Sequence, residues 1–176
     1  MESPTIYLGQ ITLRKYEESD INAWQEWDTD PEVQEYLPEP INVTVSHLDQ
    51  RAYLHDCLAA RSDAYWSIVW TETKRSIGTI SLNQIDQYHG VAELSIIVGD
   101  KRYWRRGVAT EAIRAVVNYA LNTIGLRRIT AECETANIGI RRALFANNFL
   151  EEGRKHEARI KRGQPIDTVL YYRLRV

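Results

Sequence analysis

The sequence has few cysteines, no long apolar run and no excess of basic residues, and each absence excludes a class of protein. Cys57 and Cys133 are the only cysteines in 176 residues, too few for a disulfide scaffold. The segment Met1–Pro4 has neither the basic nor the apolar region of an export signal, so we expect reduced thiols and a cytoplasmic location. No apolar run approaches the length that crosses a bilayer. A net charge of -2 argues against a dedicated nucleic-acid binder. We therefore expect neither a membrane nor a nucleic acid as partner.

Metal-ligand spacing and repeats are also missing. The four histidines are dispersed and have no cysteine or acidic residue at ligand spacing, so we expect no metal. The chain has no internal repeat, low-complexity tract or Pro/Gly-rich linker. With 44% hydrophobic and 26% charged residues, its composition is that of a globular protein. Residues 1–176 are expected to form a single domain.

The first part of the chain shows the patterns of strands and short helices. Alternating apolar residues predict strands, helical spacing follows Ser19-Asp20, and closely spaced prolines predict a loop. The expected elements are a strand over Gln10–Tyr16, a helix over Ile21–Trp27, a mostly irregular stretch with one helical turn over Asp30–Val43, a helix capped by Ser46 that runs to about Ala60, and an antiparallel meander of strands over Tyr65–Thr71, Ser76–Gln84 and Val91–Val98.

The pattern changes after Gly107, where apolar residues recur at helical spacing up to position 124. Gly125 then supplies a C-terminal stop, as glycine commonly does. The remaining expected elements are a strand over Arg128–Cys133, a helix over Asn137–Ala146, a strand over Phe149–Ile160, a turn at Gly163–Pro165 and a strand over Thr168–Leu174. This order of elements predicts an α/β or α+β layer architecture with a mixed sheet.

A basic loop joins the strand that ends at Val98 to the helix that opens at Gly107. The first turn of a helix leaves backbone N–H groups free, and the small residues at 107 and 109 let an anion approach them, so a diphosphate would fit here. The loop alone is equally compatible with an ordinary turn whose cations are solvated, because short glycine-containing turns are weak motifs. Its four cationic side chains are Lys101, Arg102, Arg105 and Arg106.

The loop resembles a known cofactor-binding motif. The run Tyr103–Ala112, YWRRGVATEA, is similar to the YWGKGxATEA form of the pyrophosphate-binding Q/R-x-x-G-x-G/A motif of GNAT acetyltransferases. This form is typical of the branch of ribosomal-protein N-terminal acetyltransferases, the RimJ/RimL type. Trp104 stands where the wider family has Gln or Arg, as is usual in that branch, and Arg105 replaces the branch's customary Gly.

Other segments extend the resemblance over nearly the whole chain. Leu13-Arg14 with Ser19-Asp20 resembles the branch's opening strand and helix, and the segment from Asn137 to Gly153 resembles its N-x-x-S…GF-x-x-EG region. Gly163–Asp167 resembles its closing hairpin. The resemblance implies a mixed, largely antiparallel central sheet flanked by helices, with a splayed strand pair at the cofactor site. It also implies an N-acetyltransferase that transfers an acetyl group from acetyl-CoA directly to a primary amine.

Carried onto this sequence, the family's functional positions fall into three groups. Glu93, eleven residues before Trp104, matches the glutamate base of histone-acetylating members; the alternative is an outward-facing strand residue. Main-chain groups of the strand before the loop hold the pantetheine arm and thioester, and Asn137 contacts this arm in addition to capping its helix. The implied cofactor-binding residues are Ile97, Val98, Gly99, Trp104, Arg105, Arg106, Gly107, Val108, Ala109, Thr110 and Asn137. The residues implied to border the acceptor are Trp24, Trp27 and Tyr36, for which the alternative is a role in the core.

Departures from the family pattern leave the catalytic acid open. Ile140 stands at the branch's serine and Leu144 at the wider family's tyrosine, and neither can protonate a departing thiolate. Tyr103, Tyr119 or solvent remain as alternatives. The missing acid also keeps open a non-catalytic acyl-CoA-binding sensor or interaction module with the same fold. Asn148 replaces the branch's Gly, and Asn tolerates the left-handed conformation that a helix end often needs.

The sequence does not choose the acceptor or the assembly. The acceptor amine is open between a protein N-terminus, as the branch implies, and a small molecule. The segment that borders the acceptor in this fold carries no recognisable motif. The assembly is open between a monomer and a homodimer.

Overall fold

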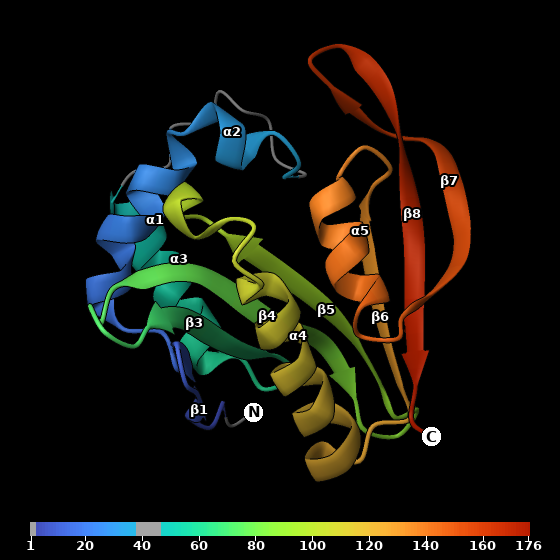
Figure 1. Ribbon diagram of the computed structural model, residues 1–176, viewed down its shortest axis with the longest axis horizontal. Helices are drawn as coiled ribbons and strands as arrows, with labels where there is room; N and C mark the ends of the chain where they lie inside the picture. The colour runs from blue at the N-terminus through green and yellow to red at the C-terminus, as the bar shows by residue number, and fades with distance from the viewer. Residues whose placement is uncertain (1–2, 38–46) are drawn as a thin grey trace.

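An eight-stranded mixed sheet forms the centre of the computed structural model (Figure 1), which describes residues 3–37 and 47–176. Neighbouring strands are antiparallel except β5 and β6, which are parallel. The largely antiparallel sheet predicted from the sequence is therefore confirmed. In spatial order the strands are β1 (Ile6–Leu8), β2 (Ile11–Arg14), β3 (Ala64–Trp70), β4 (Ser76–Asp86), β5 (Val91–Val98), β6 (Arg128–Glu134), β8 (Gln164–Leu174) and β7 (Leu150–Lys161).

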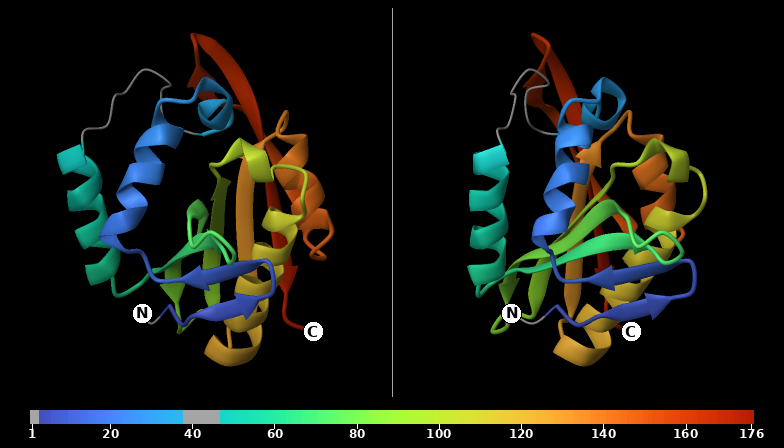
Figure 2. Two further views of the ribbon diagram at one scale, coloured as in Figure 1. Left: turned by 60° about the vertical axis from the view of Figure 1, so that its left-hand side comes forward. Right: turned by 90° about the vertical axis from the view of Figure 1, so that its left-hand side faces the viewer.

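Helices cover both faces of this sheet. Figure 2 shows α1 and α3 side by side on one face, with α4 and α5 on the other. Short 3-10 turns precede α1 and α4, and the one-turn helix α2 follows α1. The helical elements are η1 (Glu18–Asp20), α1 (Ile21–Asp28), α2 (Pro31–Gln34), α3 (His47–Ala59), η2 (Lys101–Tyr103), α4 (Val108–Asn118) and α5 (Ile138–Phe145).

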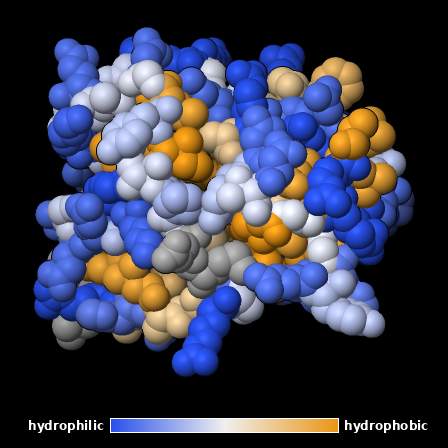
Figure 3. Space-filling view, turned by 90° about the horizontal axis from the view of Figure 1, so that it is seen from below, coloured by the Kyte–Doolittle hydropathy of each residue, from blue (hydrophilic) through white to orange (hydrophobic). Residues whose placement is uncertain are grey.

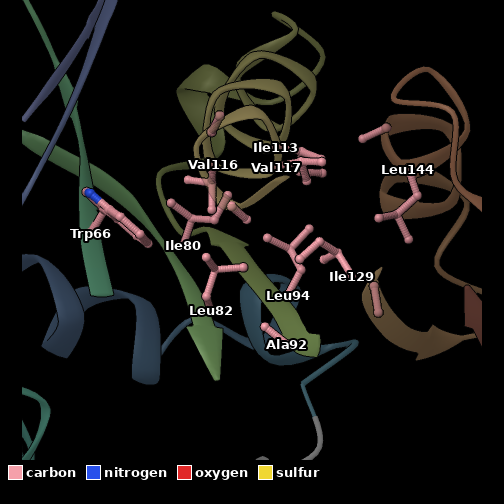
Figure 4. Close-up of a cluster of buried hydrophobic side chains, with 14 of the residues drawn as sticks. Trp66, Ile80, Leu82, Ala92, Leu94, Ile113, Val116, Val117, Ile129 and Leu144 are labelled. Carbon is pink, nitrogen blue, oxygen red and sulfur yellow. The ribbon is translucent and has the colours of Figure 1, made fainter. Parts of the chain in front are cut away.

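The apolar stripe of α4 holds this helix on the sheet. Ile113, Val116 and Val117 are fully buried and belong to the main core cluster. They face sheet residues that include Ile80 and Leu94 (Figure 4). A second, smaller cluster packs α1 and α3 against the opposite face. Burial of each large aliphatic side chain contributes about 1.5–3 kcal/mol, so this packing fixes the start of α4 beside the end of β5.

Two strands differ from the sequence-based expectation. The first predicted strand is the second arm of a hairpin, because β1 and β2 are joined at Gly9, whose φ is 74°. β1 is too short for its alternation to stand out in the sequence. The closing strand β8 begins at Gln164 rather than at Thr168, because the tight turn at Arg162-Gly163 allows pairing to start at once.

The long helix after Gly107 also changes character. It is α-helical to Asn118 and continues as a π-helical stretch, η3 (Tyr119–Ile124). Gly125 ends it in the left-handed conformation, with φ 86°, which confirms the predicted stop. The predicted cap at Ser46 lies outside the described residues.

The lower end of the molecule has an ordinary surface. Figure 3 shows hydrophobic residues in separate groups among hydrophilic ones, as is normal for the surface of a globular protein. In the part of the chain that the structure describes, no helix combines the length and apolar character needed to cross a membrane. Within those same residues, no group of His, Cys, Asp and Glu side chains could hold a metal ion.

Asn147 and Asn148 provide a matched test of how α5 is fixed to α4. Asn147 is buried, and its Nδ2 donates to the carbonyls of Thr110 (3.0 Å) and Ala143 (2.8 Å). We expect Asn147→Ala to lower the free energy of unfolding by about 1–3 kcal/mol, because buried carbonyls lose a donor. Asn148 has a φ of 58°, which confirms the left-handed conformation, so Asn148→Gly should be neutral or slightly stabilising. Chemical denaturation measures both variants, and equal losses would contradict these roles.

Candidate active site

The parallel strands β5 and β6 pair at one end and then separate. Their paired positions are Val91 with Arg128, Ala92 with Ile129, and Glu93 with Thr130. Beyond Glu93, β5 continues beside β4 and β6 continues beside β8, and the two strands diverge (Figure 1). The predicted splayed pair is confirmed. Because the facing backbone groups of both strands lose their sheet partners, the gap can receive an extended ligand that supplies new ones.

Only alternate residues of β5 turn their backbone groups toward this gap. The Gly99 N–H donates to the Ile77 carbonyl of β4 (3.0 Å), and such bonds recur at every second residue of an antiparallel ladder. The groups of Ile97, which pairs with Thr79, therefore also face β4, whereas those of Val98 face the gap. Of the expected residues Ile97, Val98 and Gly99, Val98 is therefore the one whose main-chain groups face the gap. A main-chain contact with the pantetheine arm stays a prediction.

The Val98 carbonyl has an internal partner from the loop. It accepts a hydrogen bond from the indole Nε1 of Trp104 (2.6 Å), which ties the basic loop to the end of β5. Ile96 has the same backbone orientation as Val98 by the alternation of the ladder. Nothing in the sequence singles out Ile96, because backbone orientation depends on strand pairing and not on residue type. Val98 and Ile96 are thus the β5 residues whose N–H groups point into the gap.

Two of the four loop cations form ion pairs with carboxylates of the protein itself. Asp100 is buried, caps η2 by accepting from the Arg102 N–H (3.1 Å), and accepts twice from the Arg102 guanidinium (2.9 and 2.6 Å). These bonds hold the pKa of Asp100 below its usual range. Lys101 forms ion pairs with Asp30 (2.8 Å) and Glu32 near α2. Of the four cations that were candidates to bind an anion, two therefore remain available.

Arg105 and Arg106 are those two. Both are exposed, and neither forms an ion pair among the residues described. The Arg106 guanidinium lies over the Tyr103 ring, 5.6 Å from its centroid. Arg105 has a φ of 60°, which explains why the related motif has Gly at this position, since left-handed backbone costs other residues about 1–2 kcal/mol.

The N-terminus of α4 lies directly after these arginines. Gly107 is left-handed, with φ 79°, and caps the helix without a side chain. The first intrahelical bond runs from the Glu111 N–H to the Gly107 carbonyl (3.0 Å), so the N–H groups of residues 108–110 have no intrahelical acceptor. A Cβ added at Gly107 would meet nothing within 4 Å. Open space, free N–H groups and two cations fit a diphosphate.

Glu93 stands where the two strands separate. Its neighbours Ala92 and Leu94 are buried in the main core beneath α4 (Figure 4). Side chains alternate along a strand, so Glu93 faces the opposite side together with Ile97, which packs against the α1–α3 cluster. Its partly exposed carboxylate therefore lies on the face away from α4. This position agrees with an outward-facing residue and also with a base reached from that face.

Comparisons with known proteins agree with this geometry. A family model described as an acetyltransferase (GNAT) domain matches residues 10–149. The uncharacterized N-acetyltransferase p20 of Bacillus licheniformis is 30% identical over 168 residues, which is 95% of this chain and 94% of p20. The chain belongs to the GNAT acetyltransferase family. This chain is therefore an N-acetyltransferase by its family, and acetyl-CoA is the acetyl donor that the GNAT family uses.

Two further likenesses concern proteins with named substrates. The structure of spermidine N-acetyltransferase from Vibrio cholerae, in complex with CoA and spermine, matches with a TM-score of 0.85 at 21% identity and covers 96% of this chain and 97% of that one. The ribosomal-protein-serine acetyltransferase of Escherichia coli is 26% identical over 98 residues, which is 56% of this chain and 54% of that protein. The first likeness shows the GNAT fold, and the second covers only about half of each chain.

The family's acid positions are unsuitable in this acetyltransferase. Leu144 is 1% exposed and points into the core between α5 and α4 (Figure 4), and Ile140 packs against the same core. Tyr119 lies eleven residues after Val108, or about 16 Å along the helix, with its ring against Trp66. Of the two tyrosines left open as the acid, Tyr103 is the one that lies in the loop.

Asn137 caps α5, as its position in the sequence predicts. Its side-chain oxygen accepts from the Ile140 N–H (3.2 Å). The cap uses the oxygen, so the amide nitrogen is the atom through which Asn137 would reach a ligand. The predicted contact with the pantetheine arm stays a prediction.

The aromatic residues expected at the acceptor side occupy different environments. Trp24 and Trp27 are 6% and 7% exposed and belong to the second core cluster, in line with the alternative role in the core. Trp27 packs directly on Gly99, because a Cβ there would lie 2.0 Å from the indole ring. Tyr36 is 38% exposed and is the accessible member of the three.

Sequence reasoning missed an ion pair at the open end of the gap. Glu134, at the end of β6, pairs with Lys161 from β7, and the two side chains are 5% and 13% exposed. The Lys161 ammonium also donates to the Glu35 carbonyl at the end of α2 (2.5 Å) and lies 5.9 Å from the centroid of the Tyr36 ring. No sequence signal marks this pair, because its partners are far apart in the chain.

Gly99→Ala tests the contact between α1 and the cofactor loop. The added methyl group would overlap the Trp27 ring, so we expect a loss of about 1–3 kcal/mol in the free energy of unfolding. Gly153→Ala is the matched control, because a Cβ there meets nothing within 4 Å. Thermal unfolding measures both variants. Equal stability of the two would show that Trp27 does not pack on Gly99.

Proposed function

We propose that this protein transfers the acetyl group of acetyl-CoA directly to a primary amine. The observation that carries the proposal is the junction of three features: the gap beyond Glu93, the free N-terminus of α4, and Arg105 and Arg106, which form no ion pair with the residues that the structure describes. Together they match a ligand with an extended arm and a diphosphate. The binding residues would be Trp104 to Thr110 for the diphosphate, with Val98 and Ile96 along the arm.

The residues of the gap suit direct transfer. When bound, acetyl-CoA supplies an activated acetyl thioester. The N–H groups of Val98 and Ile96 point into the gap, where a backbone donor can stabilise negative charge on a carbonyl oxygen. Glu93 would accept the proton of the amine, directly or through water, from the face away from α4.

The cysteines offer no support for a covalent acyl-enzyme route. Burial raises the pKa of Cys133 to about 11 and also raises the pKa of the Cys57 thiol. Both thiols are therefore protonated at neutral pH, and the thiol is a poor nucleophile. The departing CoA thiolate would take a proton from solvent or from Tyr103.

The relatives suggest two alternative acceptors. A ribosomal-protein-serine acetyltransferase and a spermidine N-acetyltransferase are both similar to this chain. The YWRRGVATEA loop favours the RimJ/RimL-type branch and a protein N-terminal amine in the cytoplasm. A small polyamine is the other candidate, and its fit rests on the fold alone.

A non-catalytic acyl-CoA-binding module is the second candidate function. It is favoured by Leu144 and Ile140, which are apolar and packed at the family's acid positions. Solvent can protonate a thiolate, so these residues do not exclude turnover. Acetyl-CoA binding without thiol release across peptides, polyamines and aminoglycosides would favour the module.

Coenzyme A is expected to stabilise the protein by mass action. At one hundred times the dissociation constant the gain is about 2.7 kcal/mol, or roughly 5–10 °C in the melting temperature. Gly107→Glu should abolish this shift, because it places bulk and negative charge at the free N–H groups. Gly107→Asn is the control, since Asn tolerates the left-handed backbone and adds no charge. Absence of a shift in the wild type at saturating coenzyme A would overturn the proposal.

Glu93→Gln tests the proposed base. The change keeps the shape and removes the proton acceptor, so we expect kcat to fall by about 10²–10⁴-fold, while the thermal shift with coenzyme A stays that of the wild type. A free-thiol release assay with acetyl-CoA and the best acceptor of the panel measures kcat. Unchanged turnover would remove Glu93 from the mechanism and leave solvent as the base.

A further inference from the structure

Glu134 lies at the level of the gap where transfer would occur. Glu134 and Ile97 each lie four residues beyond the last paired positions, Thr130 and Glu93, so they stand at the same height on the two diverging strands. Cys133 packs into the core beneath α4 and α5. Because side chains alternate, Glu134 points to the opposite face, which is also the face of Glu93.

The carboxylate of Glu134 is buried and holds a single cation. Its partner among the described residues is Lys161. The neighbouring carboxylate on this face, Glu132, is bound by both Lys155 (2.7 Å) and Arg159 (3.2 Å). A buried carboxylate needs a cation, since an unpaired one loses its hydration without compensation. Glu134 therefore requires a cation at this position, whatever molecule supplies it.

Lys161 is well placed to be exchanged for another ammonium. Its backbone is fixed by the tight turn at Arg162-Gly163, where φ is 49° and 74°, and Arg162 binds Glu35 independently (3.0 Å). The hairpin therefore keeps its contact with the end of α2 when the Lys161 side chain moves. That side chain is a flexible four-carbon stem with a compact charge. Tyr36 beside it offers an aromatic ring to any cation that takes its place.

We propose that Glu134 binds an ammonium group of the acceptor and that Lys161 occupies this position in the free enzyme. The proposal rests on the proposed function, because the acceptor is taken to be an amine. Primary amines are protonated at neutral pH, so the exchange replaces one ammonium by another and leaves the charge of the site unchanged. Cationic amines are thereby selected over neutral acceptors of the same shape.

Titration calorimetry with n-butylammonium at pH 7, in the presence of saturating coenzyme A, tests this exchange. Lys161→Met removes the internal competitor, and we expect it to bind butylammonium about tenfold more tightly than the wild type, the order of effect that a hydrogen bond to a charged group produces. Lys161→Arg keeps a competing cation and should bind as weakly as the wild type. The double variant Lys161→Met with Glu134→Gln should lose the gain. n-Butanol should bind alike to all four proteins.

The outcomes separate this inference from the proposed function. No gain in Lys161→Met, or a gain that persists in the double variant, would overturn the role of Glu134 while the coenzyme A thermal shift remains. Loss of that shift in the wild type would instead overturn the proposed function. If Lys161→Met does not fold, Lys161→Gln takes its place, and Glu134→Gln alone must then show no tightening over the wild type.

Discussion

The loss of pairing between β5 and β6 is the constraint on which the rest of the site depends. Up to Glu93 and Thr130 the two parallel strands share hydrogen bonds, and beyond them each strand retains a partner on its outer side only. Backbone groups inside a protein must find partners. The separation therefore creates a row of groups that demand a ligand or an internal substitute, and the Trp104 indole is such a substitute for the Val98 carbonyl.

The gap stays open because both of its walls are fixed by packing elsewhere. The buried stripe of α4 holds that helix against β4 and β5, so its N-terminus cannot move away from the strand end. On the other face, Trp27 packs on Gly99, and Arg75 forms ion pairs with both Glu26 of α1 and Asp100 (3.8 Å). The α1–α2 segment and the cofactor loop are thus parts of one rigid corner.

Residue type and local spacing were enough for much of this structure. The apolar stripe after Gly107 predicted α4, and the glycine and small residue at its start predicted a free N-terminus, because these properties are local. The splayed strand pair is predicted only by the resemblance of the chain to the GNAT family. Strand pairing follows from neither source, so the sequence does not separate Val98 and Ile96 from Ile97 and Gly99 by the direction of their backbone groups.

Interactions between distant segments account for the remaining errors and omissions. Lys101 is equivalent to Arg105 and Arg106 in the sequence, since the acids that neutralise it come from the region of α2. Arg102 differs, because its partner Asp100 lies two residues away in the same loop. The ion pair of Glu134 with Lys161 was invisible for the same reason as that of Lys101. Side chains that are interchangeable by composition acquire opposite roles once the fold decides which carboxylates they meet.

The distribution of charge over the site follows from which carboxylates the fold brings to which cations. At the cofactor loop, the carboxylates Asp100, Asp30 and Glu32 pair with Lys101 and Arg102, while Arg105 and Arg106 form no ion pair within residues 3–37 and 47–176. Positive potential is therefore concentrated in front of α4, although the whole chain carries a net charge of -2. At the other side of the gap, Glu134 lies beneath a lysine that can leave. We therefore expect the diphosphate of the cofactor at the N-terminus of α4 and the ammonium group of the acceptor at Glu134. The acetyl transfer would take place between these two positions, beside β5.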